Sequence, residues 1–176
     1  MANRLALREF HSRLAERLKA ARTKGVTASW LAVEAGGLKY LFPLSQSAEI
    51  FPWAGAQAVA YTQPWFTGVA NLRGGLFGVV DLASFVTGRA PAFRTELART
   101  EARLVALNTM LGVNCALLID RLAGLRHPEA FSDFSARAPD DPEFFGHSYV
   151  DVDGATWQEI NLQSLSLLPK FLSISA

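Results

Sequence analysis

The stretch of sequence that decides the fold is Gly68-Val69-Ala70-Asn71-Leu72-Arg73-Gly74-Gly75-Leu76-Phe77-Gly78-Val79-Val80-Asp81-Leu82. Two apolar runs flank Asn71 and Gly74-Gly75, which are residue types that tolerate positive φ and therefore favour turns. The pattern predicts two strands joined by a tight glycine turn. Because Arg73 follows the first strand and precedes the glycines, we expect its side chain to be held near the turn.

The same alternation of short strands and turns continues on both sides of this stretch. Gly36-Gly37 is a favourable two-residue connection and predicts a hairpin. Asp153-Gly154 predicts a second one. The strands expected outside the central stretch are 30–33, 40–44, 104–107, 113–119, 148–152 and 156–162. Strands of four to eight residues separated by turns predict a mainly β fold, built as a barrel or a pair of barrels.

The remaining segments are predicted to be loops and short helical turns. Residues 51–67 are irregular and rich in Pro, Ala, Trp and Gly, and the polar stretch 127–143 contains three prolines, so both are expected to be loops. Residues 121–125 are expected to continue the strand 113–119 after a break. Residues 95–102 predict one or two helical turns, and 164–171 predict a last turn broken by Pro169.

The first 25 residues differ in charge from the rest of the chain. They carry seven Lys or Arg and two Glu, a formal charge of +5, whereas the remaining residues carry ten basic and fourteen acidic side chains, a charge of −4. Apolar residues recur there at helical spacing, at Leu7, Phe10, Leu14 and Leu18. This pattern predicts an amphipathic helix in a 1–25 extension, followed by one domain over 26–176.

We expect the apolar face of this extension to pack on the protein's own core or on a partner. An organelle transit peptide and contact with a membrane surface are the alternatives. Transit peptides avoid acidic residues, and this segment contains Glu9 and Glu16.

Composition excludes several classes of protein. The chain has 176 residues, of which 50% are hydrophobic and 19% charged, so it can bury a core and does not resemble a disordered chain. No apolar run approaches the roughly 20 residues that a membrane-spanning helix needs. Cys115 is the single cysteine, which excludes a disulfide framework and a cysteine-rich zinc site. This cysteine usage fits a cytoplasmic location.

The sequence offers no constellation suited to catalysis. Motifs for a nucleophile elbow, a phosphate loop, a dinucleotide fingerprint and a zinc peptidase are all missing. The spacing of His11, His127 and His147 fits no metal site. We expect Cys115 to be a core residue, and Asp151 and Asp153 to serve the adjacent turn. The resulting prediction is that the protein is not an enzyme and has no catalytic, cofactor-binding or metal residues.

The central stretch resembles the most recognisable run of the CheW-like adaptor family. In that family Gly-Val-x-Asn-Leu-Arg-Gly is followed by a few hydrophobic residues and Asp-Leu. The matching positions here are Gly68, Val69, Asn71, Leu72, Arg73, Gly74, Asp81 and Leu82. Upstream, Glu49-Ile50 resembles the family's Glu-Ile element. The resemblance runs from about residue 30 to 168. The amphipathic start and the Glu-Ile-Phe-Pro segment resemble the PilI-type branch, which serves type IV pili and twitching motility.

The resemblance implies a fold and a role. The fold would be two packed five-stranded, SH3-like barrels, preceded here by the helix. The role would be non-catalytic: a scaffold that couples the cytoplasmic tip of a methyl-accepting chemoreceptor to the regulatory domain of a CheA-type histidine kinase, at receptor arrays. The residues that it would place at partner contacts are Glu49, Ile50, Gly68, Val69, Asn71, Leu72, Arg73 and Gly74. Glu49 and Arg73 match an acidic and basic pair on the family's interaction surface.

Some positions depart from the family pattern. Gly78 stands where a proline is usual, and Asn161-Leu162 replaces the common Leu-Asp of the final strand.

Other interpretations remain open at the level of sequence. Arg73 could be a surface arginine in a local salt bridge instead of an interface residue. Trp53 and Trp65 could pack in the core or contact a partner. The chain could be a small β-barrel enzyme or ligand-binding module, which would need a polar pocket near His147 or Asp151. It could also bind nucleic acid through its basic arm, although the domain itself is mildly acidic.

Overall fold

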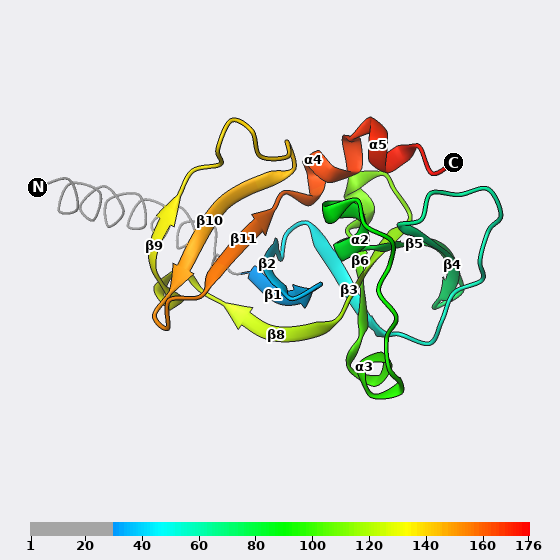
Figure 1. Ribbon diagram of the computed structural model, residues 1–176, viewed down its shortest axis with the longest axis horizontal. Helices are drawn as coiled ribbons and strands as arrows, with labels where there is room; N and C mark the ends of the chain where they lie inside the picture. The colour runs from blue at the N-terminus through cyan, green and yellow to red at the C-terminus, as the bar shows by residue number, and fades with distance from the viewer. Residues whose placement is uncertain (1–29) are drawn as a thin grey trace, which may run out of the picture.

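The computed structural model describes residues 30–176, so the helix predicted over 1–25 lies outside the described residues. Eleven strands form two sheets in this part of the chain, which confirms the mainly β prediction (Figure 1). In spatial order, the six-stranded sheet contains β8 (Arg121–Arg126), β1 (Trp30–Ala35), β2 (Leu38–Pro43), β11 (Thr156–Ile160), β10 (Phe145–Asp151) and β9 (Phe131–Ser135). The five-stranded sheet contains β3 (Ser47–Pro52), β6 (Arg103–Leu107), β7 (Cys115–Ile119), β5 (Gly75–Asp81) and β4 (Phe66–Leu72).

Short helices connect and cover these strands. They are α2 (Leu82–Thr87), α3 (Glu96–Glu101), α4 (Leu162–Leu167), α5 (Pro169–Leu172) and the 3₁₀ turns η1 (Thr109–Leu111) and η2 (Pro128–Ala130). Asp81 begins α2, because its carboxylate accepts a hydrogen bond from the backbone N–H of Ser84. Asn161 caps α4 in the same way. These caps explain why the chain leaves a strand and begins a helix at Asp81-Leu82 and at Asn161-Leu162.

The two sheets share one hydrophobic core. Alternate residues of β1 face opposite sides: Leu31 and Val33 pack with Val105 and Leu117 of the other sheet. Trp30 and Ala32 face a second cluster inside the six-stranded sheet, with Phe131, Tyr149 and Trp157. A core supplied by both sheets makes the described residues one structural unit.

Asp120 marks the point where the chain passes from one sheet to the other. It is the only residue between β7 and β8, and its backbone N–H bonds to the carbonyl oxygen of Glu34 in β1. The expectation that residues 121–125 continue the preceding strand is therefore wrong. They form β8, which pairs with β1 in the six-stranded sheet.

A partly buried arginine, Arg94, links this corner to the five-stranded sheet. One terminal nitrogen of Arg94 lies 2.8 Å from Asp81 Oδ2, and the other lies 2.8 Å from Asp120 Oδ1. Asp120 Oδ2 also accepts a bond of 2.7 Å from the backbone N–H of Gly36, in the β1–β2 hairpin. Burial alone would lower the pKa of Arg94, but Asp81 and Asp120 raise it. The guanidinium stays charged and links three segments.

Three further expectations need correction. The stretch 127–143 is not all loop, because it contains η2 and β9. Phe131 of β9 is buried in the aromatic cluster, and the polar residues of this edge strand face solvent. These polar residues are the reason that the sequence did not predict a strand here. The loop predicted from residue 51 begins later, because β3 extends to Pro52. The six-stranded sheet also has one strand more than the expected five.

Candidate functional site

The turn between β4 and β5 has the conformation that its sequence requires. Leu72 pairs with Gly75, so Arg73 and Gly74 form a two-residue turn. Both have positive φ, 51° at Arg73 and 82° at Gly74. The Asn71 side chain accepts a bond of 2.9 Å from the backbone N–H of Gly74 and holds the turn closed. A non-glycine residue with positive φ is uncommon, so Arg73 is held in a conformation of raised energy.

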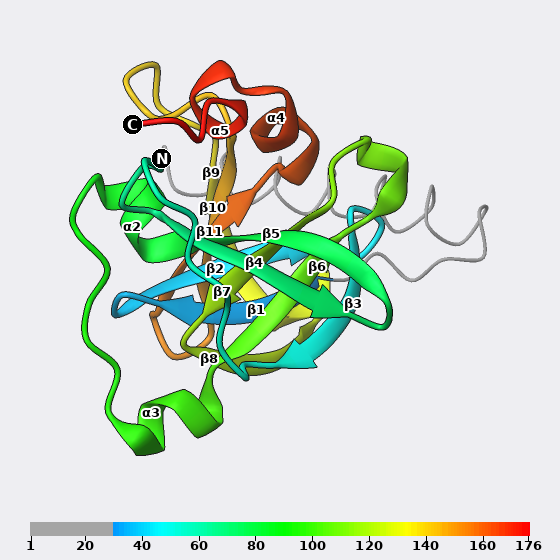
Figure 2. The same ribbon diagram turned by 90° about the vertical axis from the view of Figure 1, so that its right-hand side faces the viewer.

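The side chain of Arg73 reaches across to the other edge of the same sheet. Its terminal nitrogen lies 2.6 Å from Glu49 Oε1 in β3, and its guanidinium carbon lies 6.0 Å from the centre of the Phe51 ring. Figure 2 shows the β4–β5 turn and β3 on the same side of the molecule. The Arg73 side chain is 75% exposed and that of Glu49 is 40% exposed. The pair therefore lies on the surface with its polar atoms accessible.

Ile50 does not join this pair. Because side chains alternate along a strand, Glu49 and Phe51 share the face toward Arg73, and Ile50 points to the other face. Ile50 is nevertheless exposed, so it could contact a partner on a neighbouring surface. Phe51 was not among the predicted site residues, although its position two residues after Glu49 would have indicated a shared face.

A shallow depression of about 460 Å³ lies beside the turn. Its lining includes Val69, Asn71 and Leu72 from β4, Leu76 from β5, and residues of the loop that follows β3. Leu76 is 63% exposed. The candidate site therefore combines one accessible ion pair with an apolar hollow, which is the composition of a protein-binding surface.

Gly68 and Val69 shape the site through their backbone. Both backbone groups of Val69 bond to Gln57, at 2.8 and 2.9 Å, so the loop after β3 closes against the outer edge of β4. Gly68 has a φ of 139°, and a Cβ at this position would lie 2.2 Å from the carbonyl oxygen of Gln57. Gly68 is buried, so it cannot offer a contact surface itself.

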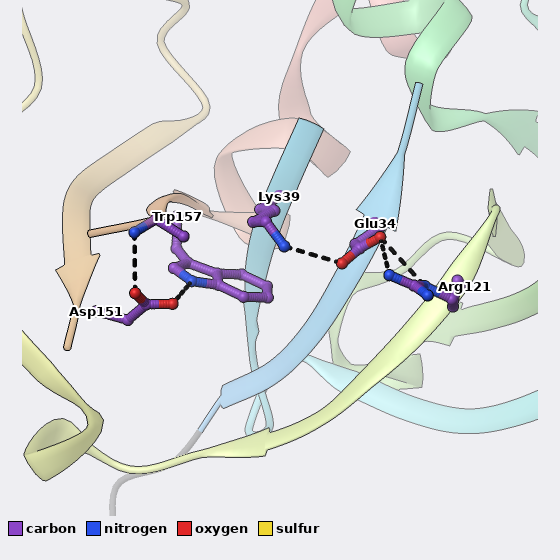
Figure 3. Close-up of polar contacts among 6 residues, drawn as sticks. Glu34, Lys39, Arg121, Asp151 and Trp157 are labelled. Carbon is purple, nitrogen blue, oxygen red and sulfur yellow. Dashed lines mark hydrogen bonds and ion pairs between the residues drawn. The ribbon is translucent and has the colours of Figure 1, made fainter. Parts of the chain in front are cut away.

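The groups considered for chemistry are engaged elsewhere. Cys115 is buried, which raises the pKa of its thiol to about 12 and leaves it unreactive. The Asp151 carboxylate accepts a hydrogen bond from the Trp157 indole (Figure 3). It also accepts hydrogen bonds from the backbone N–H groups of Asp153 and Ala155. Among residues 30–176, no cluster of three His, Cys, Asp or Glu side chains could hold a metal ion.

Trp53 and Trp65, which the sequence left undecided between core and partner contact, have different positions. Trp65 is buried against Phe85 and Phe171, so it is a core residue. Trp53 is half-buried and packs against the cluster on the outer side of the five-stranded sheet.

Comparison with known proteins decides the family. The family model for the CheW-like domain matches residues 29–166, which is more than half of the chain. The chain belongs to the CheW-like family. A crystal structure of the scaffolding protein TtCheW from Thermoanaerobacter tengcongensis has a similar fold, with a TM-score of 0.62 and 16% sequence identity. That similarity covers 77% of this chain and 89% of TtCheW. A search of curated proteins finds no match.

Two departures from the CheW-like pattern have a local explanation. At Gly78, an added Cβ would lie 3.0 Å from the Phe66 ring, so this member packs an aromatic side chain where the family usually has proline. Asn161 caps α4, because its amide oxygen accepts a hydrogen bond from the backbone N–H of Ser164. Neither departure touches the Glu49–Arg73 pair.

The described residues were also searched for a membrane-spanning helix. No helix within residues 30–176 is both long enough and apolar enough to cross a bilayer.

Proposed function

We propose that this chain is a non-catalytic scaffold that couples the cytoplasmic tip of a methyl-accepting chemoreceptor to the regulatory domain of a CheA-type histidine kinase. Membership in the CheW-like family supports the role of an adaptor in chemosensory signalling. The single observation that carries the site is the exposed Glu49–Arg73 pair beside the hollow of β4 and β5.

The energetics of Arg73 support a binding role over a stabilising one. An exposed ion pair contributes about 0–1 kcal/mol to folding. The positive φ of Arg73 costs about 1–2 kcal/mol, so this residue gives the folded chain little or no net stability. An arginine fixed by a turn and oriented by Glu49 is, however, preorganised for a partner, and arginine is enriched among residues that dominate binding energy.

The eight predicted contact residues take three roles in this proposal. Arg73, Glu49 and Leu72 contact the partner, together with Ile50 on the adjoining face. Asn71 and Gly74 hold the turn, and Gly68 and Val69 hold the loop after β3 against β4. Leu76 and Phe51 extend the contact surface beyond the predicted set.

Binding of the kinase regulatory domain tests this site. Titration calorimetry with the wild type, Arg73→Ala and the matched control Arg89→Ala would measure it, because Arg89 is an exposed arginine distant in sequence from the turn. We expect Arg73→Ala to weaken binding at least thirtyfold, which corresponds to about 2 kcal/mol, and Arg89→Ala to leave it unchanged. If the wild type and both variants bound the kinase domain with the same affinity, and also bound the receptor tip with the same affinity, the proposed site would be contradicted.

The pathway is a finer proposal. The Glu-Ile-Phe-Pro segment and the basic amphipathic extension support the PilI-type branch, in which the scaffold controls type IV pili. Deletion of the gene should then abolish twitching on a surface and leave swimming in liquid unchanged. The opposite pattern would assign the chain to a flagellar pathway.

A further inference from the structure

A second depression lies at the far end of the six-stranded sheet and is not used by the proposed function. It has a volume of about 530 Å³ and opens between the end of β8 and the β10–β11 turn. Two apolar side chains on its lining are largely exposed, Leu125 at 55% and Val152 at 76%. Exposed apolar side chains that converge on a hollow favour the docking of another apolar surface.

The charge around this depression is acidic. Its lining includes the carboxylates of Glu129, Asp151 and Asp153 and only one permanent cation, Arg126. The guanidinium carbon of Arg126 lies 5.3 Å from the centre of the Trp157 ring, so this cation is packed on the sheet. Glu129 and Asp153 are exposed on the rim. A basic, amphipathic partner would complement both the charge and the apolar side chains.

This chain contains a segment of that chemistry. Residues 1–25 carry seven Lys or Arg and two Glu, and their apolar residues recur at helical spacing. The segment joins the described domain beside the depression, because Trp30 pairs in register with Arg126. A segment tethered at its docking surface has an effective concentration on the order of millimolar, which favours it over a free partner.

We propose that residues 1–25 dock on this depression within the same chain. The row of Leu7, Phe10, Leu14 and Leu18 would contact Leu125 and Val152, and the basic side chains beside the row would face Glu129 and Asp153. This surface is separate from the turn of Arg73, so the inference does not rest on the proposed function. It assigns the sequence extension an intramolecular site and leaves the Glu49–Arg73 pair uncovered.

Amide hydrogen exchange of the full-length chain tests the docking. In the wild type, we expect peptides from residues 1–25 to exchange at least tenfold more slowly than unprotected amides. Leu125→Glu with Val152→Glu should remove this protection. The control Leu38→Glu should retain the protection. Leu38 is about as exposed as Leu125, but it lies at one end of β2, whereas Pro43, which pairs with Trp30 where the extension begins, lies at the other end. Unprotected exchange in the wild type, or protection that survives the double substitution, would overturn the proposal.

A charge exchange provides a second test without apolar substitutions. Glu129→Lys with Asp153→Lys should speed exchange of residues 1–25, and adding Arg13→Glu with Arg17→Glu should restore the protection. No recovery in the combined variant would contradict the pairing. Protection that disappears on tenfold dilution would indicate docking on a second copy, which would also overturn the intramolecular proposal.

Discussion

Glu49 and Arg73 lie 24 positions apart in the sequence, at opposite edges of the five-stranded sheet, and form an ion pair of 2.6 Å on the surface. The pair connects β3 to the turn between β4 and β5. The backbone hydrogen bonds of the sheet do not join β3 directly to β4 or β5. Glu49 thereby orients the Arg73 side chain. The site therefore depends on the turn, which gives Arg73 its positive φ, and on Glu49, which directs the Arg73 side chain.

Replacing Arg73 by glycine should separate stability from binding. Glycine adopts positive φ without the cost that arginine carries, so Arg73→Gly should raise the free energy of unfolding by about 1 kcal/mol. The same change removes the guanidinium and should weaken kinase binding as strongly as Arg73→Ala. Urea denaturation and calorimetry measure the two effects. A loss of stability on this substitution would show that the ion pair, and not the partner, is the reason for an arginine here.

Gly68 should be intolerant of any side chain. Gly68→Ala would bring its Cβ 2.2 Å from the carbonyl oxygen of Gln57 and retain an unfavourable φ, so we expect a loss of at least about 2 kcal/mol. Gly55→Ala is the matched control, since Gly55 also has positive φ but nothing within 4 Å of an added Cβ. Similar losses in both variants, measured by urea denaturation, would show that the contact with Gln57 does not matter.

Arg94 should be the most sensitive arginine of the described domain. Arg94→Ala leaves the buried carboxylate of Asp81 without its cationic partner, and removing one member of a buried pair costs about 3–5 kcal/mol. Arg121→Ala, which breaks the exposed pair with Glu34, should cost less than about 1 kcal/mol. Thermal denaturation of the two variants compares them. Equal melting temperatures would contradict the role of Arg94 as a link between the sheets.

Acid should destabilise the six-stranded sheet through two carboxylates (Figure 3). The hydrogen bond from Trp157 lowers the pKa of Asp151, and although burial raises the pKa of Glu34, hydrogen bonds from Lys39 and Arg121 lower it overall. A pKa that is lower in the folded state means stabilisation that is complete above the unfolded pKa, at about 4, and is lost as the pH falls through the folded value.

The variant Glu34→Gln with Asp151→Asn should therefore lose less stability than the wild type between pH 6 and pH 3. Urea midpoints at a series of pH values measure this slope, with the exposed Glu143→Gln as the control. A double variant with the wild-type slope would show that other groups cause the acid sensitivity.

Local chemistry in the sequence predicted much of this fold. The turns at Gly36-Gly37, Arg73-Gly74 and Asp153-Gly154 follow from their glycines, which all have positive φ, and Cys115 is buried as its apolar neighbours indicated. The assignment of β8 was wrong because strand pairing depends on distant residues, here Glu34 and Asp120, and not on the strand's own pattern. The edge strand β9 was missed because its exposed residues are polar.

The candidate site was only partly accessible from the sequence. Turn chemistry placed Arg73 near the glycines, but the partnership with Glu49 came from the family resemblance, because spacing alone does not bring two edge strands together. The structural role of Gly68 depends on the approach of Gln57, which no local pattern reveals. Leu76 entered the site only when the register of β5 was known, whereas the spacing of Phe51 from Glu49 already indicated a shared face.

The most direct test of the scaffold role is a three-component capture experiment. The immobilised cytoplasmic tip of the cognate receptor is incubated with the kinase regulatory domain, with and without this chain. We expect the receptor tip to retain the kinase domain only when the wild-type chain is present, and Arg73→Ala to abolish this retention while Arg89→Ala preserves it. Retention of the kinase domain that is the same with and without the chain would contradict the account.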